Sequence, residues 1–211
     1  TLHNSHVVSN TVNGSSGGGG IFTSTALTVT DSLISGNVVS DSQGMGGGIM
    51  NNDVPLVLIR STVSNNTIVV SGTQLFGGGG IFGGARIVES TISGNSAYRS
   101  GGIFVQGRSL IIINSTISGN DSFENGGGIY TNNAATQLFN TTVAYNRANA
   151  DASGLGIGGG VLSAAGSGTV TFDNSVLAKN DSIRVVSQAF QIDPDDCAGA
   201  LTSQGDNLVA A

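Results

Sequence analysis

The sequence repeats one polar phrase along its whole length, and this repeat constrains the fold more than any other feature. The copies read NSHVVSN, DSLISGN, RSTVSNN, ESTISGN, NSTISGN, NTTVAYN and NSVLAKN. Each copy closes with an asparagine, at Asn10, Asn37, Asn66, Asn95, Asn120, Asn146 and Asn180. Six glycine runs followed by an apolar pair, such as GGGGIF and GGGIY, alternate with these copies. A recurring period of this length is typical of proteins built from stacked units. The sequence therefore predicts about seven units of one design.

Apolar residues recur at three places in each unit. Two residues before the phrase they are Val29, Leu58, Ile87, Ile112, Leu138 and Phe172. Three residues into the phrase they are Val7, Ile34, Val63, Ile92, Ile117, Val143 and Leu177. After the glycine runs they are Ile21, Ile49, Ile81, Ile103, Ile129 and Val161. Three short strands per unit, each stacking one inward side chain on the next unit, predict an all-β, single-stranded parallel β-helix of about seven three-sided rungs. We expect one domain over residues 1–211, with 181–211 as a less regular closing segment.

The closing asparagines are expected to lie at a corner of the coil. An amide side chain both donates and accepts hydrogen bonds, so equivalent asparagines in neighbouring rungs can form a ladder. The glycine runs lack the Lys and Ser or Thr of a phosphate-binding loop, and no helix pattern follows them. We therefore assign the glycines to tight corners and positive φ angles.

Composition excludes two classes of function. The net charge is −6 and the chain has only seven Lys and Arg residues, whereas nucleic-acid binding requires clustered cations. The longest strictly aliphatic run, Leu110 to Ile113, is far shorter than the roughly 20 residues of a membrane-spanning helix. No nucleic-acid partner and no membrane span are expected in this chain.

The phrases STISGN and GGGIY, together with the terminal DPDDCAGALTSQGDNLV, carry a resemblance to a known family. They resemble bacterial surface or secreted right-handed β-helix proteins of the choice-of-anchor type. The resemblance covers nearly the whole chain and is most specific from Asn174 to Val209. It implies a right-handed coil and an extracellular or cell-surface location, but it implies no defined activity. Family members continue toward an anchor beyond the point at which this sequence stops, at Ala211.

Candidate catalytic and metal-binding residues are few. Polysaccharide lyases with this fold need acidic side chains around calcium and a basic residue nearby. The acidic residues Asp31, Glu89 and Asp173 occur singly at corners, and Asp31 and Glu89 with Arg60 between them favour a charge ladder over a site. A cluster near the C-terminus is either a calcium site or a solvated loop; it contains Asp193, Asp195, Asp196 and Asp206. His3 and His6 lack partners at metal-ligand spacing, and Cys197 is expected to be buried. No catalytic residue and no cofactor are assigned.

Two outward columns are apolar. Strand alternation directs the residues just before the phrases outward, which gives an apolar stripe of Ile59, Val88, Ile113 and Phe139. This stripe is either a contact surface or the floor beneath a long loop. A second column, Phe22, Met50, Phe82, Phe104, Tyr130 and Leu162, is either a platform for sugar rings or a layer beneath variable loops, and we favour the loops.

Both ends of the coil lack an evident cap in the sequence, so either the caps lie outside this chain or the ends meet other subunits. The second alternative gives the hypothesis of self-association along the axis, and the apolar stripe gives that of association through the stripe. The sequence favours a non-enzymatic extracellular structural β-solenoid, such as a surface rod, a matrix or filament component or an adhesin. Its partners would be other copies or other surface proteins. The alternative is a protein that binds or cleaves polysaccharide.

Overall fold

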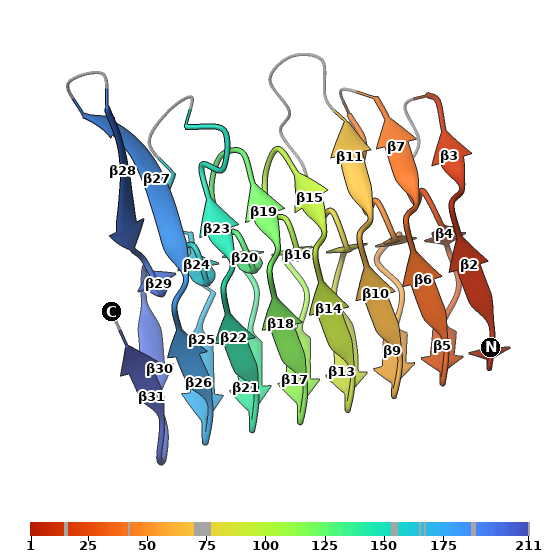
Figure 1. The fold of residues 1–211 in the computed structure, drawn as a ribbon. Coiled ribbons are helices and arrows are strands. Elements are labelled where there is room, and N and C mark those ends of the chain that lie inside the picture. Colours follow the sequence, from red (N-terminus) through yellow and green to blue (C-terminus); the bar gives the residue numbers. More distant parts are fainter. Residues whose placement is uncertain are drawn as a thin grey trace.

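The computed structural model describes residues 1–14, 17–41, 43–69, 77–152, 156–164, 166, 168–186 and 189–210. These residues form short strands, β1 to β31, and no helix, so none of them belongs to a helix that could cross a membrane. The chain winds as a coil, and each turn of the coil, here called a rung, adds one strand to each of four sheets (Figure 1). The parallel β-helix predicted from the repeat is confirmed.

The four sheets are named A to D in the order in which the chain visits them. Sheet A contains β1 (Leu2–His3), β5 (Leu27–Thr30), β9 (Leu56–Ile59), β13 (Ala85–Val88), β17 (Leu110–Ile113), β21 (Thr136–Phe139), β25 (Val170–Asp173) and β30 (Leu201–Ser203). Sheet B contains β2 (His6–Val8), β6 (Leu33–Ser35), β10 (Thr62–Ser64), β14 (Thr91–Ser93), β18 (Thr116–Ser118), β22 (Thr142–Ala144), β26 (Val176–Ala178) and β31 (Leu208–Ala210). Sheet C contains β3 (Thr11–Val12), β7 (Val38–Ser40), β11 (Thr67–Val69), β15 (Ser96–Ala97), β19 (Asp121–Ser122), β23 (Arg147–Ala148), β27 (Asp181–Val186) and β28 (Ala189–Pro194). Sheet D contains β4 (Ile21–Thr23), β8 (Ile49–Asn51), β12 (Ile81–Phe82), β16 (Ile103–Gln106), β20 (Ile129–Asn132), β24 (Val161–Ser163) and β29 (Cys197–Ala198).

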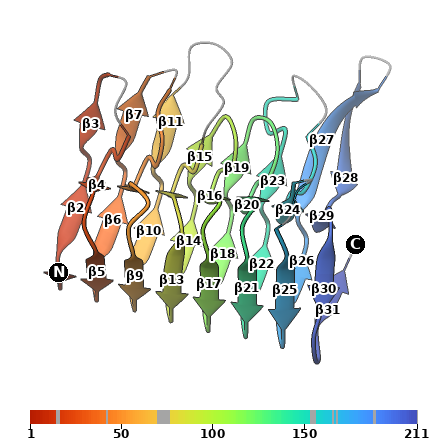
Figure 2. The ribbon, with the colours of Figure 1, turned by 180° about the vertical axis from the view of Figure 1, so that it is seen from behind.

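Each strand pairs in parallel with its counterpart in the next rung. In sheet B, for example, Val63 is opposite Ile34 on one side and Ile92 on the other. The reverse view in Figure 2 shows the same stack from the N-terminal to the C-terminal rung. One pair departs from this rule, because β27 and β28 form an antiparallel hairpin at the last edge of sheet C. Residues 181–211 otherwise add a parallel strand to sheets A, B and D.

The three predicted apolar columns form the core. Leu58, Val63 and Ile81, one from each column, are fully buried, and so are most of their counterparts in other rungs. The columns face inward because side chains alternate along a strand, and equivalent residues stack because the rungs are in register. β-Branched side chains suit this arrangement since they pack well on a pleated surface. The prediction of these columns is confirmed.

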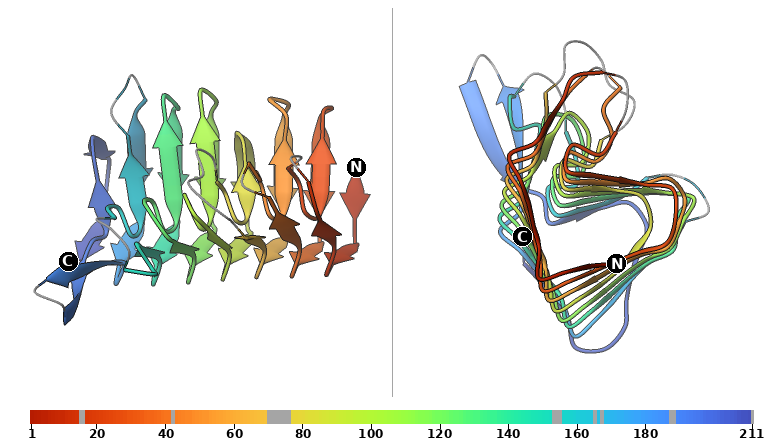
Figure 3. Two further views of the ribbon diagram at one scale, coloured as in Figure 1. Left: turned by 90° about the horizontal axis from the view of Figure 1, so that it is seen from above. Right: turned by 90° about the vertical axis from the view of Figure 1, so that its right-hand side faces the viewer.

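The prediction of three strands per rung is wrong, because sheet C supplies a fourth. Figure 3, in the view down the coil axis, shows the chain continuing past the three-sided core before it returns. Sheet C buries its own small cluster of Val39, Ile68 and Ala97, separate from the main core. In later rungs the corresponding inward residues include Ser122, Ala148 and Ser182, so this column is no longer aliphatic.

The glycine runs are required mainly by close approach between backbones. A Cβ placed on Gly102, the last glycine of its run, would lie 2.3 Å from the carbonyl oxygen of Gly128 and 3.2 Å from the amide of Asn120. Gly80 occupies the same place one rung earlier and meets the carbonyl of Gly102 and the amide of Asn95 in the same way. The last glycine of the run therefore leaves room for the asparagine ladder.

Gly102→Ala is expected to destabilise the protein by about 2 kcal/mol, as overpacking of a close-packed interior does. The added methyl group meets backbone, which cannot move aside as a flexible side chain would. Gly107→Ala is the matched control, because nothing lies within 4 Å of its Cβ and its only cost is a φ of +65°, about 1 kcal/mol. Urea unfolding measures both. Equal losses for the two variants would contradict the close-approach explanation.

Candidate functional site

The closing asparagines form one continuous ladder inside the coil. From Asn10 to Asn146, each donates its backbone N–H and its Nδ2–H to the Oδ1 atom of the asparagine in the next rung, at distances of 2.8 to 3.1 Å. From Asn37 onward, Nδ2 also donates to a sheet B carbonyl in the preceding rung; Asn95, for example, donates to Val63. The six asparagines from Asn37 to Asn180 are 0% exposed. These residues therefore connect adjacent rungs and present no group to solvent.

A second ladder, which was not predicted from the sequence, lies at the corner between sheets A and B. The second residue of each phrase is Ser or Thr. At five junctions its hydroxyl accepts the backbone N–H of the equivalent residue in the preceding rung. This holds for Ser5 to Ser32, Ser32 to Ser61, Ser61 to Ser90, Ser90 to Ser115 and Thr141 to Ser175, at 3.0 to 3.1 Å. The available signal was the Ser or Thr at that position in all seven copies.

Both ladders end on side chains of residues 181–211. Asp196 Oδ1 accepts the backbone N–H of Asn180 at 2.9 Å and its Nδ2–H at 2.8 Å. Asn207 Oδ1 accepts the backbone N–H of Ser175 at 2.8 Å. In the backbone, Asp196 occupies the position that the last glycine of each run occupies in earlier rungs. The N–H of Val161 donates to the carbonyl of Asp196, just as the N–H of Ile129 donates to the carbonyl of Gly160.

The structure does not bring the four calcium candidates together. Asp193 pairs with Arg184 at 2.5 Å, and this guanidinium lowers the pKa of the carboxyl group. Asp195 accepts the backbone N–H of Gly158, and burial raises its pKa. Asp196 is in the ladder, and Asp206 lies exposed between β30 and β31. Within the described residues no three His, Cys, Asp or Glu side chains are placed to hold a metal ion, and the calcium site stays a prediction.

The remaining reactive residues have structural partners. Arg60 donates from Nε and Nη2 to the two carboxylate oxygens of Asp31, at 2.7 and 2.8 Å, and this lowers the pKa of Asp31. His3 Nδ1 lies 3.7 Å from the same carboxylate. Cys197 is a half-buried free thiol that packs on the core opposite Val161, and burial raises its pKa. These contacts fit a surface charge ladder and a core position.

The apolar stripe lies on the outer face of sheet A. Ile59, Val88, Ile113 and Phe139 are in register in four consecutive rungs, as the alternation predicts. Each of them is half-buried. The stripe is therefore continuous but only partly accessible to solvent.

The aromatic column is largely covered. Phe82, Phe104 and Tyr130 stack on one another with ring centroids 5.3 and 5.0 Å apart. Phe104 is only 2% exposed, whereas Phe22 in the first rung is 53% exposed. The guanidinium of Arg99 lies 5.7 Å from the Tyr130 ring centroid. The column serves chiefly as a stacked layer, and its central ring offers no face to a sugar.

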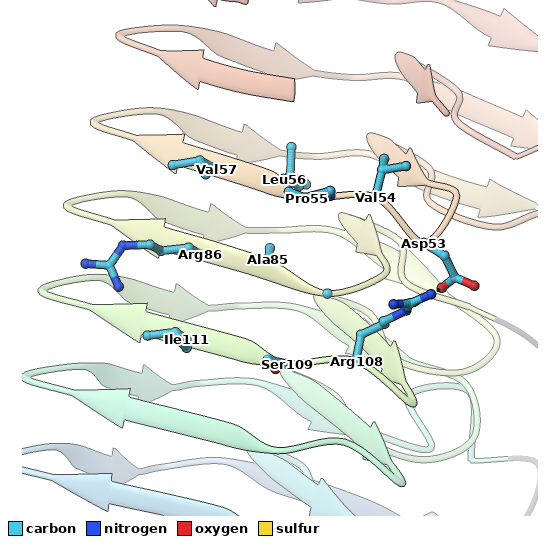
Figure 4. Close-up of a pocket in the computed structure, with 11 residues that line it drawn as sticks. Asp53, Val54, Pro55, Leu56, Val57, Ala85, Arg86, Arg108, Ser109 and Ile111 are labelled. Atoms are coloured by element: carbon cyan, nitrogen blue, oxygen red, sulfur yellow. Dashed lines mark hydrogen bonds and ion pairs between the residues drawn. The ribbon is translucent and has the colours of Figure 1, made fainter. Parts of the chain in front are cut away.

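A surface hollow was not expected from the sequence. It lies where sheet D turns into sheet A, above Gly84 and Ala85, and has a volume of about 330 Å³. Figure 4 shows Pro55 and Val57 on one side of it, Ser109 and Ile111 on the other, and Arg86 and Arg108 toward its two ends. The hollow offers both apolar contacts and cations.

Comparison with protein-family models, with curated proteins and with solved structures found no match to this chain.

Proposed function

We propose that this chain is a non-enzymatic structural β-solenoid of an extracellular or cell-surface protein. It would act as a rod, as part of a matrix or filament, or as an adhesin. The observation that carries the proposal is the asparagine ladder, which runs without a break from Asn10 to Asp196. The residue that closes all seven copies of the phrase, an asparagine, thus joins one rung to the next. The location rests on the resemblance of the phrases STISGN and GGGIY to bacterial surface proteins.

The ladder supports a rod because it adds a directional contact to every rung junction. In a solenoid each unit contacts only its neighbours, so axial stiffness depends on the interfaces between neighbours. Amide groups that are buried and fully hydrogen-bonded make such an interface specific, since any shift in register leaves them unpaired. The ladder therefore favours one straight stacking of the rungs.

The stripe bears on self-association. Ile59, Val88, Ile113 and Phe139 lie in register on four consecutive rungs, and each of them is half-buried. A continuous apolar column on an outer face is suited to contact with another surface. We therefore favour contacts with other copies or other surface proteins through this stripe.

Two measurements test the proposal. Incubation with a panel of acidic polysaccharides, with and without a calcium chelator, is expected to release no unsaturated or reducing ends, whereas release in either condition would contradict a non-enzymatic role. Negative-stain electron microscopy over a range of concentrations is expected to show short rods that pair side by side.

The variant Ile113→Asp places a charge in the stripe and is expected to leave single rods. Thr30→Asp, in the same outward column, is the control and is expected to pair as the parent does. Filaments that grow by end contacts, or pairing that persists in Ile113→Asp, would contradict association through the stripe.

A further inference from the structure

The hollow on sheet A exists because one rung is shorter than its neighbours. Only Gly83 and Gly84 connect β12 to β13, whereas residues 52–55 connect β8 to β9 and residues 107–109 connect β16 to β17. The longer corners on both sides overhang the short one. Their overhang leaves the open space lined by Pro55, Ala85 and Ser109. Its volume of about 330 Å³ is within the range of roughly 300 to 1,000 Å³ that ligand pockets occupy.

An ion pair bridges the short rung. Arg108 Nε lies 3.2 Å from Asp53 Oδ1, although the two residues belong to corners two rungs apart. The side chains of Arg108 and Asp53 are 52% and 66% exposed, so the pair keeps donors and acceptors free for another molecule. Asp53 also borders a second hollow, of about 380 Å³, beside Met50, Phe82 and Gln106. The Asp53–Arg108 ion pair therefore lies between the two adjoining hollows.

Arg86 stands at the other end of the hollow and has no carboxylate partner within the described residues. Its neighbours in register are Val57 and Ile111, both aliphatic. The other cations each lie beside a carboxylate or a ring: Arg60 with Asp31, Arg99 with Glu124, Arg108 with Asp53, Arg184 with Asp193, Arg147 in register with Asp121, and Lys179 over Tyr145. An unpaired guanidinium between apolar side chains, on a chain of net charge −6, is suited to one anionic group rather than to general attraction of anions.

We propose that this hollow binds an acidic sugar residue of a polysaccharide. The uronate carboxylate pairs with Arg86, because a planar guanidinium matches the two oxygens of a carboxylate. The apolar face of the sugar ring lies over Pro55, Val57 and Ile111. The sugar hydroxyls bond to the exposed Asp53–Arg108 pair, and the next residue of the polymer lies along the second hollow. The site binds the sugar but does not catalyse a reaction. The proposal is therefore compatible with the role of a structural rod and does not depend on that role.

Isothermal titration calorimetry with hexagalacturonate and with neutral cellohexaose tests the proposal. The parent protein is expected to bind hexagalacturonate and to bind cellohexaose at least tenfold more weakly. Arg86→Gln is expected to weaken hexagalacturonate binding by about tenfold or more, since a charge-assisted hydrogen bond to a carboxylate is lost. Lys179→Gln removes the same charge at an exposed corner of sheet B and is the matched control. It is expected to bind as the parent does.

A second variant keeps the test independent of any structural effect of Arg86. The side chain of Ser109 is exposed, and Ser109→Glu adds a carboxylate to the wall of the hollow without changing its backbone bond to Ala85. It is expected to weaken hexagalacturonate binding and to leave the urea midpoint near that of the parent. No binding of hexagalacturonate at millimolar concentration, equal binding of cellohexaose, or parent-like binding by Arg86→Gln would each overturn the proposal. The rods expected by electron microscopy do not depend on any of these results.

Discussion

Asn95→Ala is expected to lower the free energy of unfolding by about 4 kcal/mol. Asn95 Oδ1 accepts the backbone N–H and the Nδ2–H of Asn66, each at 3.0 Å, and all three groups are buried. Alanine leaves the backbone N–H of Asn66 without an acceptor, whereas Asn66 Nδ2 keeps only its bond to the Ile34 carbonyl. An unsatisfied buried polar group costs about 1–3 kcal/mol. The bond from Asn95 Nδ2 to the Val63 carbonyl is lost as well. Urea unfolding followed by circular dichroism measures the change.

Asn10→Ala is the control for the same chemistry at an exposed position. Asn10 donates to Asn37 but lies on the first rung, where water reaches it. Its replacement is expected to cost no more than about 1 kcal/mol, the net value of an ordinary hydrogen bond. A small and equal loss in both variants would show that the ladder is not an important source of stability. A large and equal loss would show that exposure of the donor group does not matter.

The repeated parts of the structure could be predicted from the sequence, because the same residue type recurs wherever the same physical demand recurs. Val63 and Ile92 are in register because both must fill the same place in the core, and the alternation of each strand makes that place visible. The asparagine positions were visible for the same reason. Sheet C was missed because its inward residues change from Ile68 to Ala97 and Ser122, so no single hydrophobic column marks it.

The features that differ between rungs could not be predicted in this way. The hollow depends on the contrast between the two-residue corner at Gly83 and the longer corners beside it, and corner length carries no signal until the register is known. The bridge from Asp53 to Arg108 joins residues 55 apart in sequence. The acidic residues near the C-terminus are clustered in the sequence. In the structure, however, Asp193 accepts a hydrogen bond from Arg184, and Asp196 accepts one from Asn180.

Asp196→Ala is expected to cost about 3 kcal/mol, because it removes the acceptor at the end of the ladder. Among the described residues the backbone N–H of Asn180 has no other acceptor, and Asn180 is fully buried, whereas its Nδ2 still donates to Val143 and Ala178. A loss of this size is expected when the buried backbone N–H of Asn180 loses its acceptor and the side-chain amide of Asn180 loses one of its hydrogen bonds. The loss is expected first in β29, β30 and β31, where hydrogen exchange would become faster, because each rung of a solenoid is held by its neighbours. Urea unfolding gives the overall change.

Asp196→Asn separates the role of the acceptor from that of the charge. It keeps Oδ1 for Asn180, and its NH2 group takes the place of Oδ2, a buried atom with no hydrogen-bond partner in the described part of the chain. Its stability is therefore expected to be within about 1 kcal/mol of the parent, as for other exchanges that keep the hydrogen bond. Asp206→Ala, at an exposed turn, is expected to change nothing. If Asp196→Asn lost as much stability as Asp196→Ala, the negative charge would be the essential feature.

Added calcium should leave the stability of the parent protein and of the three variants, Asp196→Ala, Asp196→Asn and Asp206→Ala, unchanged. The carboxylates that would have to share the ion are each bonded elsewhere or exposed to solvent.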